Sequence, residues 1–393
     1  MCIRFWNVIM KRFLTKTATV FVLLLSGNVA HPQLTMQNGI ASIEDPILLG
    51  TGRPEDYTTS TSVYPRALGE RQPTESEKKL IVRLNALMDR TRAKALALID
   101  GSDVVWTRYR DDYLKYEHFL SMSVAKSILS VATGIGICQD KLTLDTAAMT
   151  FVPELKDKDL GHARVKHLLT MTSGTWEGNR DSSIFSDEQR LYLMTGAMNL
   201  MDVLTTDKVS SSVKKFFSPK RKPGEIFAYR STDPLVLSIV LERATGIPYG
   251  EFIEQEILLP AGIQHAAVSG RDSSGFPRAD GVLRMKLMDW IRVALWIREQ
   301  RDSDTCLGHY LQEATRKHLP THPKSNYPPR LQSYGYFFGV DNKYAPDTYW
   351  AVGFGGQEIG WSTKSQKMLL SFANSDEHVV DLEKIYSEWL NDH

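Results

Sequence analysis

Hydrophobic residues recur at helical spacing at both ends of the chain and through most of its middle. This 3.6-residue period predicts amphipathic helices. Near the start it covers residues 75–92, and the final stretch covers 381–390. The central part, from about 120 to 320, is mostly helical by the same criterion. Its predicted amphipathic helices are 186–204, 233–245, 285–300 and 310–318.

Runs of apolar and β-branched residues predict strands before and after this helical part. Two early runs flank Asp100-Gly101-Ser102-Asp103, and an Asp-Gly pair between such runs is typical of a β-hairpin. The early strands are 95–99 and 104–109, and the late strands are 334–341, 349–353, 358–362 and 367–373. The order of elements predicts an α/β domain in which one sheet is built from both ends of the chain.

The first thirty residues have the pattern of a signal peptide. Lys11, Arg12 and Lys16 precede a short apolar stretch, 17–25, and small residues follow up to Ala30. Met10 is an alternative start. A membrane anchor is the other interpretation, but about ten apolar residues are half of what a span needs. We therefore expect an exported protein, periplasmic or secreted, with residues 1–30 as leader and 31–76 as an irregular arm.

Composition excludes two broad classes of protein. With 47 basic and 46 acidic residues the net charge is +1, which provides no field for non-specific binding of nucleic acid. The 8 Trp, 15 Tyr and 15 Phe argue against disorder. Only three cysteines are present, and Cys2 would leave with the leader. Cys138 and Cys306 form either a disulfide or two buried thiols. The histidines form no H-x-H or H-E-x-x-H pattern, so no metal or other cofactor is predicted.

The spacing Ser-x-x-Lys occurs four times, starting at Ser76, Ser123, Ser211 and Ser212. On a helix this spacing places both side chains on one face, so that an amine reaches a hydroxyl. Only Ser123 lies in an apolar segment, 123–137, where Lys126 is the sole charged residue. A lysine that loses its water has a pKa well below about 10.4 and can accept the serine proton. The alternative is a snorkelling lysine on a core helix.

Two further segments carry candidate chemistry. Tyr229-Arg230-Ser231 lies between a β-like run and a predicted helix, where a tyrosine can shuttle a proton. A structural tyrosine bonded to backbone is the alternative. Residues 353–357, Gly-Phe-Gly-Gly-Gln, connect two predicted strands. A backbone N–H there and that of Ser123 can form an oxyanion hole, although a tight turn explains the glycines equally well.

In this order and spacing, the three elements resemble the serine β-lactamase and penicillin-binding-protein superfamily. The resemblance is to its class C β-lactamase-like branch, which includes DD-peptidases, carboxylesterases and 6-aminohexanoate-dimer hydrolases. It covers residues 77–393 and includes the runs 167–174, 241–246 and 259–263. It implies a β-lactamase/transpeptidase-like fold, with an antiparallel sheet flanked by helices and an all-helical subdomain inserted at about 140–265.

The resemblance also implies roles for single residues. Ser123 matches the acylated nucleophile, Lys126 its base partner and Tyr229 the tyrosine of the second motif. Ser231 stands where many relatives have Asn. We place Ser231 in the substrate pocket, together with Trp176 of a neighbouring loop.

Phe354-Gly355-Gly356 aligns with the third motif, which normally begins with Lys or His, and Gln357 would supply the second oxyanion N–H. The cation of that motif helps to hold the carboxylate of β-lactams and peptides. Phe354 offers neither charge nor hydrogen bond, so we also place Phe354, Gly355 and Gly356 in a pocket for other substrates.

These features predict a serine hydrolase that cleaves a small-molecule ester or amide through a Ser123 acyl-enzyme. One alternative is a β-lactamase or DD-carboxypeptidase that uses the same residues. The other is a non-catalytic binding or sensor protein on the same fold. We expect no nucleic-acid partner and no stable membrane span, and the oligomeric state stays open.

Overall fold

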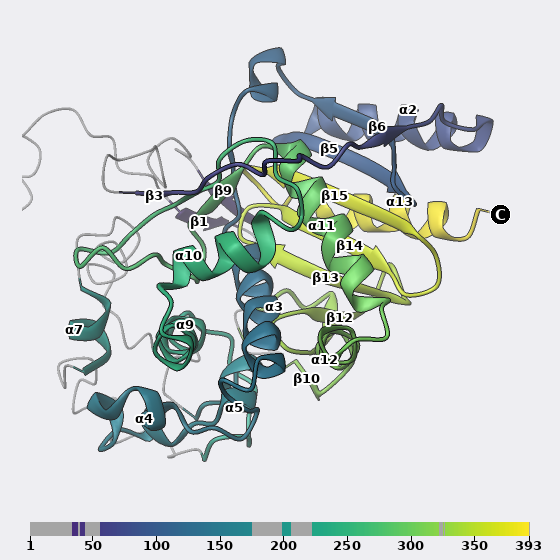
Figure 1. The fold of residues 1–393 in the computed structure, drawn as a ribbon. Coiled ribbons are helices and arrows are strands. Elements are labelled where there is room, and N and C mark those ends of the chain that lie inside the picture. The colour runs from purple at the N-terminus through teal and green to yellow at the C-terminus, as the bar shows by residue number, and fades with distance from the viewer. Residues whose placement is uncertain are drawn as a thin grey trace, which may run out of the picture.

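The computed structural model describes residues 34–37, 40–43, 56–174, 199–205, 222–321, 325 and 327–392. The predicted leader, Trp176 and most of the predicted helix 186–204 lie outside these residues. Figure 1 shows the chain as one sheet surrounded by helices, with a group of helices on one side. Among the described residues, no helix combines the length and apolar character that crossing a membrane requires.

The main sheet has nine strands and joins the two ends of the described chain. β15 pairs with β5 antiparallel, and every other neighbouring pair is antiparallel except the short edge strand β4, which runs parallel to β6. The strand order is β10 (Leu319–Pro320), β11 (Leu331–Tyr334), β12 (Gly339–Asn342), β13 (Thr348–Gly353), β14 (Gln357–Ser362), β15 (Lys367–Ala373), β5 (Ala93–Asp100), β6 (Asp103–Tyr109) and β4 (Gly69–Glu70). The predicted α/β fold with an antiparallel sheet is confirmed.

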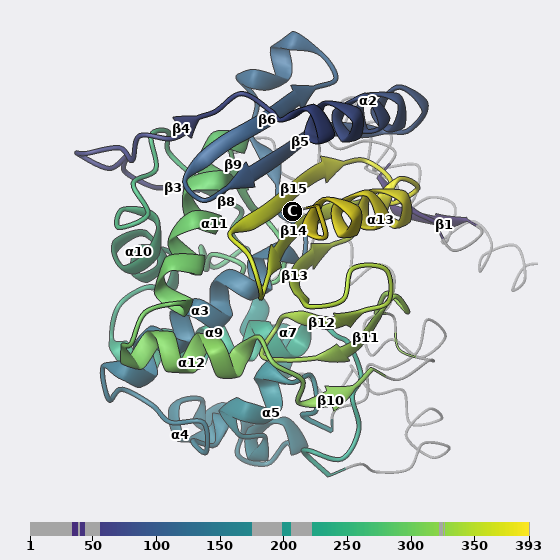
Figure 2. The ribbon, with the colours of Figure 1, turned by 90° about the vertical axis from the view of Figure 1, so that its right-hand side faces the viewer.

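Helices cover both faces of this sheet (Figure 2). On one face, α2 (Glu75–Arg90) packs beside α13 (Val379–Leu390). On the other lie α3 (Val124–Cys138), α11 (Leu287–Arg301) and α12 (Cys306–Ala314). The Trp361 indole of β14 donates to the Ala294 carbonyl of α11, 3.0 Å away. The sheet is therefore buried on both sides.

The described residues between 140 and 265 contain helices and no strand, and they form the group on the far side of α3 (Figure 1). These elements are α4 (Ala148–Phe151), η2 (Pro153–Leu155), η3 (Asp159–His162), α5 (Val165–Leu169), α7 (Leu200–Thr205), α9 (Thr232–Thr245), α10 (Tyr249–Ile253) and η5 (Glu254–Leu258).

Small elements complete the fold. A second sheet has the order β3 (Tyr57–Thr58), β8 (Val268–Ser269), β9 (Leu283–Met285) and β7 (Phe119–Leu120). A short helix, η1 (Asp112–Lys115), follows β6, and β1 (Leu34–Gln37) pairs with β2 (Ile40–Ile43).

Two predicted elements are wrong in detail. The predicted strand 334–341 is a chain reversal: β11 ends at Tyr334 and β12 begins at Gly339. Phe337 in the turn has a positive φ of 59°, which periodicity does not reveal. The helix predicted at 310–318 is α12, and it begins four residues earlier. It does so because the Thr305 hydroxyl caps it by accepting from the Gly308 N–H.

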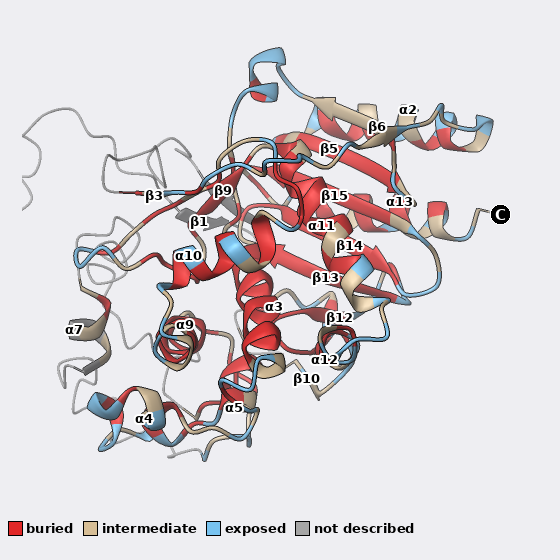
Figure 3. Ribbon diagram, viewed as in Figure 1, coloured by how far each residue is buried: buried red, intermediate tan, exposed pale blue. Residues whose placement is uncertain are grey.

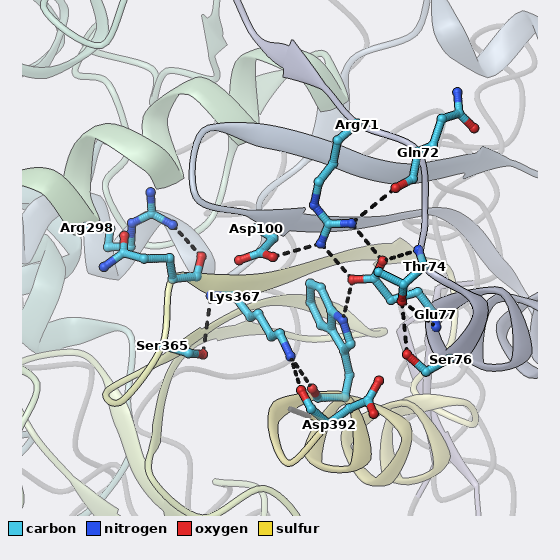
Figure 4. Close-up of polar contacts among 12 residues, drawn as sticks. Arg71, Gln72, Thr74, Ser76, Glu77, Asp100, Arg298, Ser365, Lys367 and Asp392 are labelled. Atoms are coloured by element: carbon cyan, nitrogen blue, oxygen red, sulfur yellow. Dashed lines mark hydrogen bonds and ion pairs between the residues drawn. The ribbon is translucent and has the colours of Figure 1, made fainter.

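The Glu77 carboxylate ties α2 to the sheet edge and to α13. Arg71 donates to both Glu77 oxygens at 2.7 Å and also to Asp100 at 2.7 Å (Figure 4). The indole of Trp389 donates to the same carboxylate at 2.9 Å, as does the N–H of Thr74 at 2.8 Å. Arg71 above all holds the pKa of Glu77 at about 2, although burial opposes it.

The disulfide between Cys138 and Cys306 joins the end of α3 to the start of α12. The two Cα atoms lie 5.8 Å apart, and the bridge spans 168 positions of the sequence. Of the two alternatives that the sequence leaves open, the structure shows the bridge. It anchors the helix that begins after Ser123.

Glu77→Gln tests the first of these ties. The lowered pKa means that ionised Glu77 contributes stability above about pH 4.5 and that this contribution is lost as the pH falls towards 2. We expect the variant to lose about 1–3 kcal/mol of unfolding free energy at pH 7. Urea denaturation at pH 7 and pH 3 measures the difference, which should shrink at pH 3. Glu75→Gln, at an exposed pair with Lys78, is the control. A pH-independent difference would contradict the assignment.

Candidate active site

α3 is buried on all sides, and it begins directly after Ser123 (Figure 3). Every residue from Val124 to Gly136 is buried, which agrees with a helix that is apolar all round. Ser123 itself is half-buried, and its hydroxyl makes no capping hydrogen bond to the helix. The hydroxyl therefore lies at the positive end of the α3 dipole without being used to cap it.

Lys126 turns its amine towards Ser123. Its Nζ atom donates to Ser123 Oγ at 2.7 Å and to the Asp280 main-chain carbonyl at 2.5 Å. The residue is only 2% exposed, so its head group does not snorkel to solvent. The i, i+3 spacing thus gives the amine–hydroxyl contact that the sequence predicts. The Asp280 carbonyl is a partner that sequence reasoning missed, because a main-chain contact leaves no residue pattern.

Tyr229 lies near Ser123, in the irregular segment before α9. Its hydroxyl is close enough to the Ser123 side chain for Ser123 to act on the Tyr229 pKa. Burial raises the pKa of Tyr229 above its ordinary value of 10, so the phenol is neutral at physiological pH. Lys126 Nζ lies 5.5 Å from the centre of its ring. The hydroxyl of Ser123 therefore contacts an amine and has a phenol close by.

A buried polar network fixes the segment that carries Tyr229. Ser173 Oγ donates to Asp233 at 2.6 Å, and Arg230 donates to Ser173 Oγ at 3.2 Å and to the Ala228 carbonyl at 2.7 Å. The Ala228 N–H in turn donates to the Met171 carbonyl at 2.9 Å. Sequence reasoning missed this network. Its one signal was the run 167–174, which contains Ser173.

The predicted third motif forms the turn between β13 and β14. Gly355 and Gly356 have φ values of 80° and 85°, a left-handed backbone that favours glycine. The Gln357 side-chain amide donates to the carbonyls of Phe354 and Gly355 at 3.1 and 3.0 Å, and to that of Ala373 at 2.7 Å. The Gln357 side chain is occupied in holding the turn. If Gln357 contacts substrate, it therefore does so through its backbone.

A close approach at Gly353 places this turn beside the nucleophile. A Cβ atom at Gly353 would lie 2.6 Å from the Ser121 carbonyl and 2.9 Å from Met122 Cβ. Met122, directly before Ser123, has an unusual φ of 42°. The end of β13 and the start of α3 therefore pack so closely that position 353 has room only for the hydrogen atom of a glycine side chain.

The structure ties the remaining predicted pocket residues to Ser123 by fewer contacts than Lys126. Ser231 is half-buried directly before α9 and makes no capping bond, and Phe354 is half-buried in the turn. Trp176 lies outside the described residues. In the part of the chain that the structure describes, no group of three or more His, Cys, Asp or Glu residues is placed to hold a metal ion.

Comparison with known proteins places this geometry in context. Residues 83–388 match the family model described as Beta-lactamase. The chain is 24% identical over 243 residues to the 6-aminohexanoate-dimer hydrolase of Paenarthrobacter ureafaciens, a match that covers 59% of this chain and 61% of that protein. The chain thus spans less than two thirds of this curated relative.

Two solved structures share the fold. One is a penicillin-binding protein from Bacillus halodurans, with a TM-score of 0.59 and 17% identity over 78% of this chain and 98% of that one. The other is EstCE1, described as a hydrolase with promiscuous acyltransferase activity, with a TM-score of 0.60 and 15% identity over 80% of this chain and all of that one.

Gly353→Ala tests the close approach. The added methyl group would push β13 away from Ser121 and shift the backbone before Ser123, so we expect a loss of about 1–3 kcal/mol of stability. Hydrolysis of an activated ester should fall at least about tenfold, because small displacements of reacting groups are costly. Gly270→Ala is the control, since its methyl group would meet the Val282 side chain at 3.2 Å and Asp56 Oδ1 at an ordinary contact distance of 3.9 Å. Equal effects of the two substitutions would refute the positioning role of Gly353.

Proposed function

The chain belongs to the Beta-lactamase family, and from that premise we propose that it is a serine hydrolase acting through an acyl-enzyme on Ser123. One observation carries the proposal: the buried Lys126 amine lies 2.7 Å from the hydroxyl of the half-buried Ser123, with Tyr229 close by. A nucleophile and a proton acceptor within hydrogen-bond reach are what covalent catalysis requires.

The reaction begins with attack of Ser123 Oγ on the substrate carbonyl carbon. Lys126, in its neutral form, takes the serine proton as the new C–O bond forms. The N–H groups of Ser123 and Gln357 stabilise the negative charge on the carbonyl oxygen, together with the positive end of α3. Collapse of this intermediate breaks the bond to the leaving group and leaves an ester on Ser123.

Tyr229 completes the proton balance. Its phenol is neutral, so it can donate its proton to the departing alcohol or amine and regain one from Lys126. In the second half of the reaction, water attacks the acyl-enzyme and gives up a proton to Lys126 as the new C–O bond forms. Lys126 and Tyr229 then pass a proton to Ser123 Oγ as its bond to the acyl carbon breaks. The products are the free acid and the leaving group, and the side chains end as they began.

Phe354 favours small esters or amides over substrates whose carboxylate must be held at this position. A half-buried phenylalanine at the start of the β13–β14 turn offers no charge to pair with the carboxylate of a β-lactam or a peptidoglycan peptide. The likeness to a 6-aminohexanoate-dimer hydrolase and to EstCE1 supports the amidase and esterase side of the family. Action on β-lactams or DD-peptides is the alternative function.

We also propose that the protein is exported. The sequence pattern of residues 1–30 is that of a signal peptide. The Cys138–Cys306 disulfide supports the proposal, because such bridges persist in oxidising compartments.

Ser123→Ala should lower the rate of hydrolysis of p-nitrophenyl esters at least about a thousandfold, because it removes the nucleophile. Ser76→Ala is the matched control: Ser76 has the same spacing to Lys79, but it lies on the surface helix α2. A fluorophosphonate probe followed by peptide mass spectrometry should label the Ser123 peptide of the unaltered protein. Absence of that label would favour a non-catalytic binding protein.

A chromogenic cephalosporin separates the two substrate classes. We expect turnover of the ester and of short amides to exceed that of the cephalosporin. Efficient cephalosporin hydrolysis, with weak ester hydrolysis, would establish the β-lactamase alternative.

A further inference from the structure

Asp280 contacts the reacting groups twice, although it belongs to none of the three motifs. Its main-chain carbonyl accepts from Lys126 Nζ at 2.5 Å. Its carboxylate interacts electrostatically with both Lys126 and Tyr229. The residue is 8% exposed, in the loop that leads into β9. Its backbone thus contacts Lys126, and its charge acts on both Lys126 and Tyr229.

Arg278 holds this carboxylate in a fixed place. The guanidinium donates to Asp280 Oδ1 from Nε and Nη2, at 3.0 and 2.9 Å, and to Oδ2 from Nη2 at 2.8 Å. Both residues are buried, so the pair is little weakened by solvent. Burial would raise the pKa of Asp280, but Arg278, followed by Lys126, outweighs it, and the pKa lies below its ordinary value. The carboxylate is therefore ionised at neutral pH.

The loop that carries Asp280 packs directly on the approach to the nucleophile. A Cβ atom at Gly281 would lie 3.3 Å from the Met122 carbonyl carbon, so the backbone after Asp280 touches the residue before Ser123. The Arg278 N–H donates to the Gly270 carbonyl at 3.0 Å, which ties the other side of the loop to the end of β8. Asp280 is thus fixed by its backbone as well as by its side chain.

We propose that Asp280, clamped by Arg278, is a positioning residue that supplies the fixed negative charge of the Lys126–Tyr229 proton relay. The carbonyl orients the Lys126 amine towards Ser123. The carboxylate stabilises the ammonium that forms when Lys126 takes the serine proton, at the moment when charge develops in the site. The inference rests on the proposed serine-hydrolase function, because it assigns Asp280 a part in that reaction.

Four titratable groups interact electrostatically with the Asp280 carboxylate, and they come from separate parts of the described chain. They are Lys126 on α3, Tyr229 before α9, Tyr249 on α10 and Arg278 in the same loop. Tyr249 is neutral because burial raises its pKa. Of these four, Lys126 donates a hydrogen bond to Ser123, and Tyr229 interacts with the Ser123 side chain. A change of charge at Asp280 should therefore affect the reaction by changing the pKa values of Lys126 and Tyr229.

Asp280→Asn is the direct test, because it keeps the carbonyl and the shape and removes the charge. Without the negative charge, both the Lys126 ammonium and the Tyr229 phenol release their protons at lower pH. We expect both limbs of the pH profile of kcat/KM, measured with a p-nitrophenyl ester, to move to lower pH by about one unit. The rate of fluorophosphonate labelling of Ser123 should shift in the same way.

Asp289→Asn is the matched control. Asp289 is also a buried aspartate held by an arginine, Arg292, at 3.0 Å, but its hydrogen bonds go to α11 and to the loop before β8. We expect this variant to lose stability while its pH profile stays in place. If Asp280→Asn yields no folded protein, the double variant Arg278→Met/Asp280→Asn removes both charges and leaves neither one buried alone. Its profile should move in the same direction by a smaller amount.

The outcomes separate this inference from the proposed function. Absence of Ser123 labelling in the unaltered protein refutes the serine-hydrolase function itself. With labelling intact, an unshifted profile in Asp280→Asn, even with a lower rate or a lower Tm, would show that Asp280 is only structural. A shift to higher pH would contradict the assigned sign of the charge. A shift of both limbs to lower pH supports the inference.

Discussion

The site depends on a lysine amine held where water does not reach it. A buried ammonium without partners is strongly unfavourable, and the fold provides just the partners that make it tolerable. Lys126 Nζ lies between the Ser123 hydroxyl and the Asp280 carbonyl, at 2.7 and 2.5 Å. The same burial that makes the residue costly makes its amine useful as a proton acceptor for Ser123.

Three separate parts of the chain converge on this amine and its serine. α3 supplies Ser123 and Lys126, the segment before α9 supplies Tyr229, and the loop before β9 supplies the Asp280 carbonyl. The β13–β14 turn is held against the start of α3 by the close contact at Gly353. The sheet and the helical part thus meet at Ser123, and the disulfide at Cys138 anchors the far end of α3.

The pattern of apolar residues predicted the helices and strands that are buried on one face or on all faces. An apolar run with Lys126 as its one charge indicated the helix after Ser123, and shorter apolar and β-branched runs indicated the strands that became β5, β6, β13, β14 and β15. The pattern failed at 334–341, where a positive φ at Phe337 reverses the chain, and at α12, which a capping threonine starts early. In the site, spacing gave the contact of Lys126 with Ser123. The contact with the Asp280 carbonyl could not be predicted from the sequence, because any residue can supply a main-chain oxygen.

The most direct test of this account is the rate at which a fluorophosphonate labels Ser123 when Lys126 is replaced by methionine, a residue of similar length without the amine. The account predicts a folded protein that keeps its serine but is labelled at least about a thousandfold more slowly at neutral pH, because the proton acceptor is gone. Labelling of Lys126→Met at the rate of the unaltered protein would show that the buried amine does not activate Ser123.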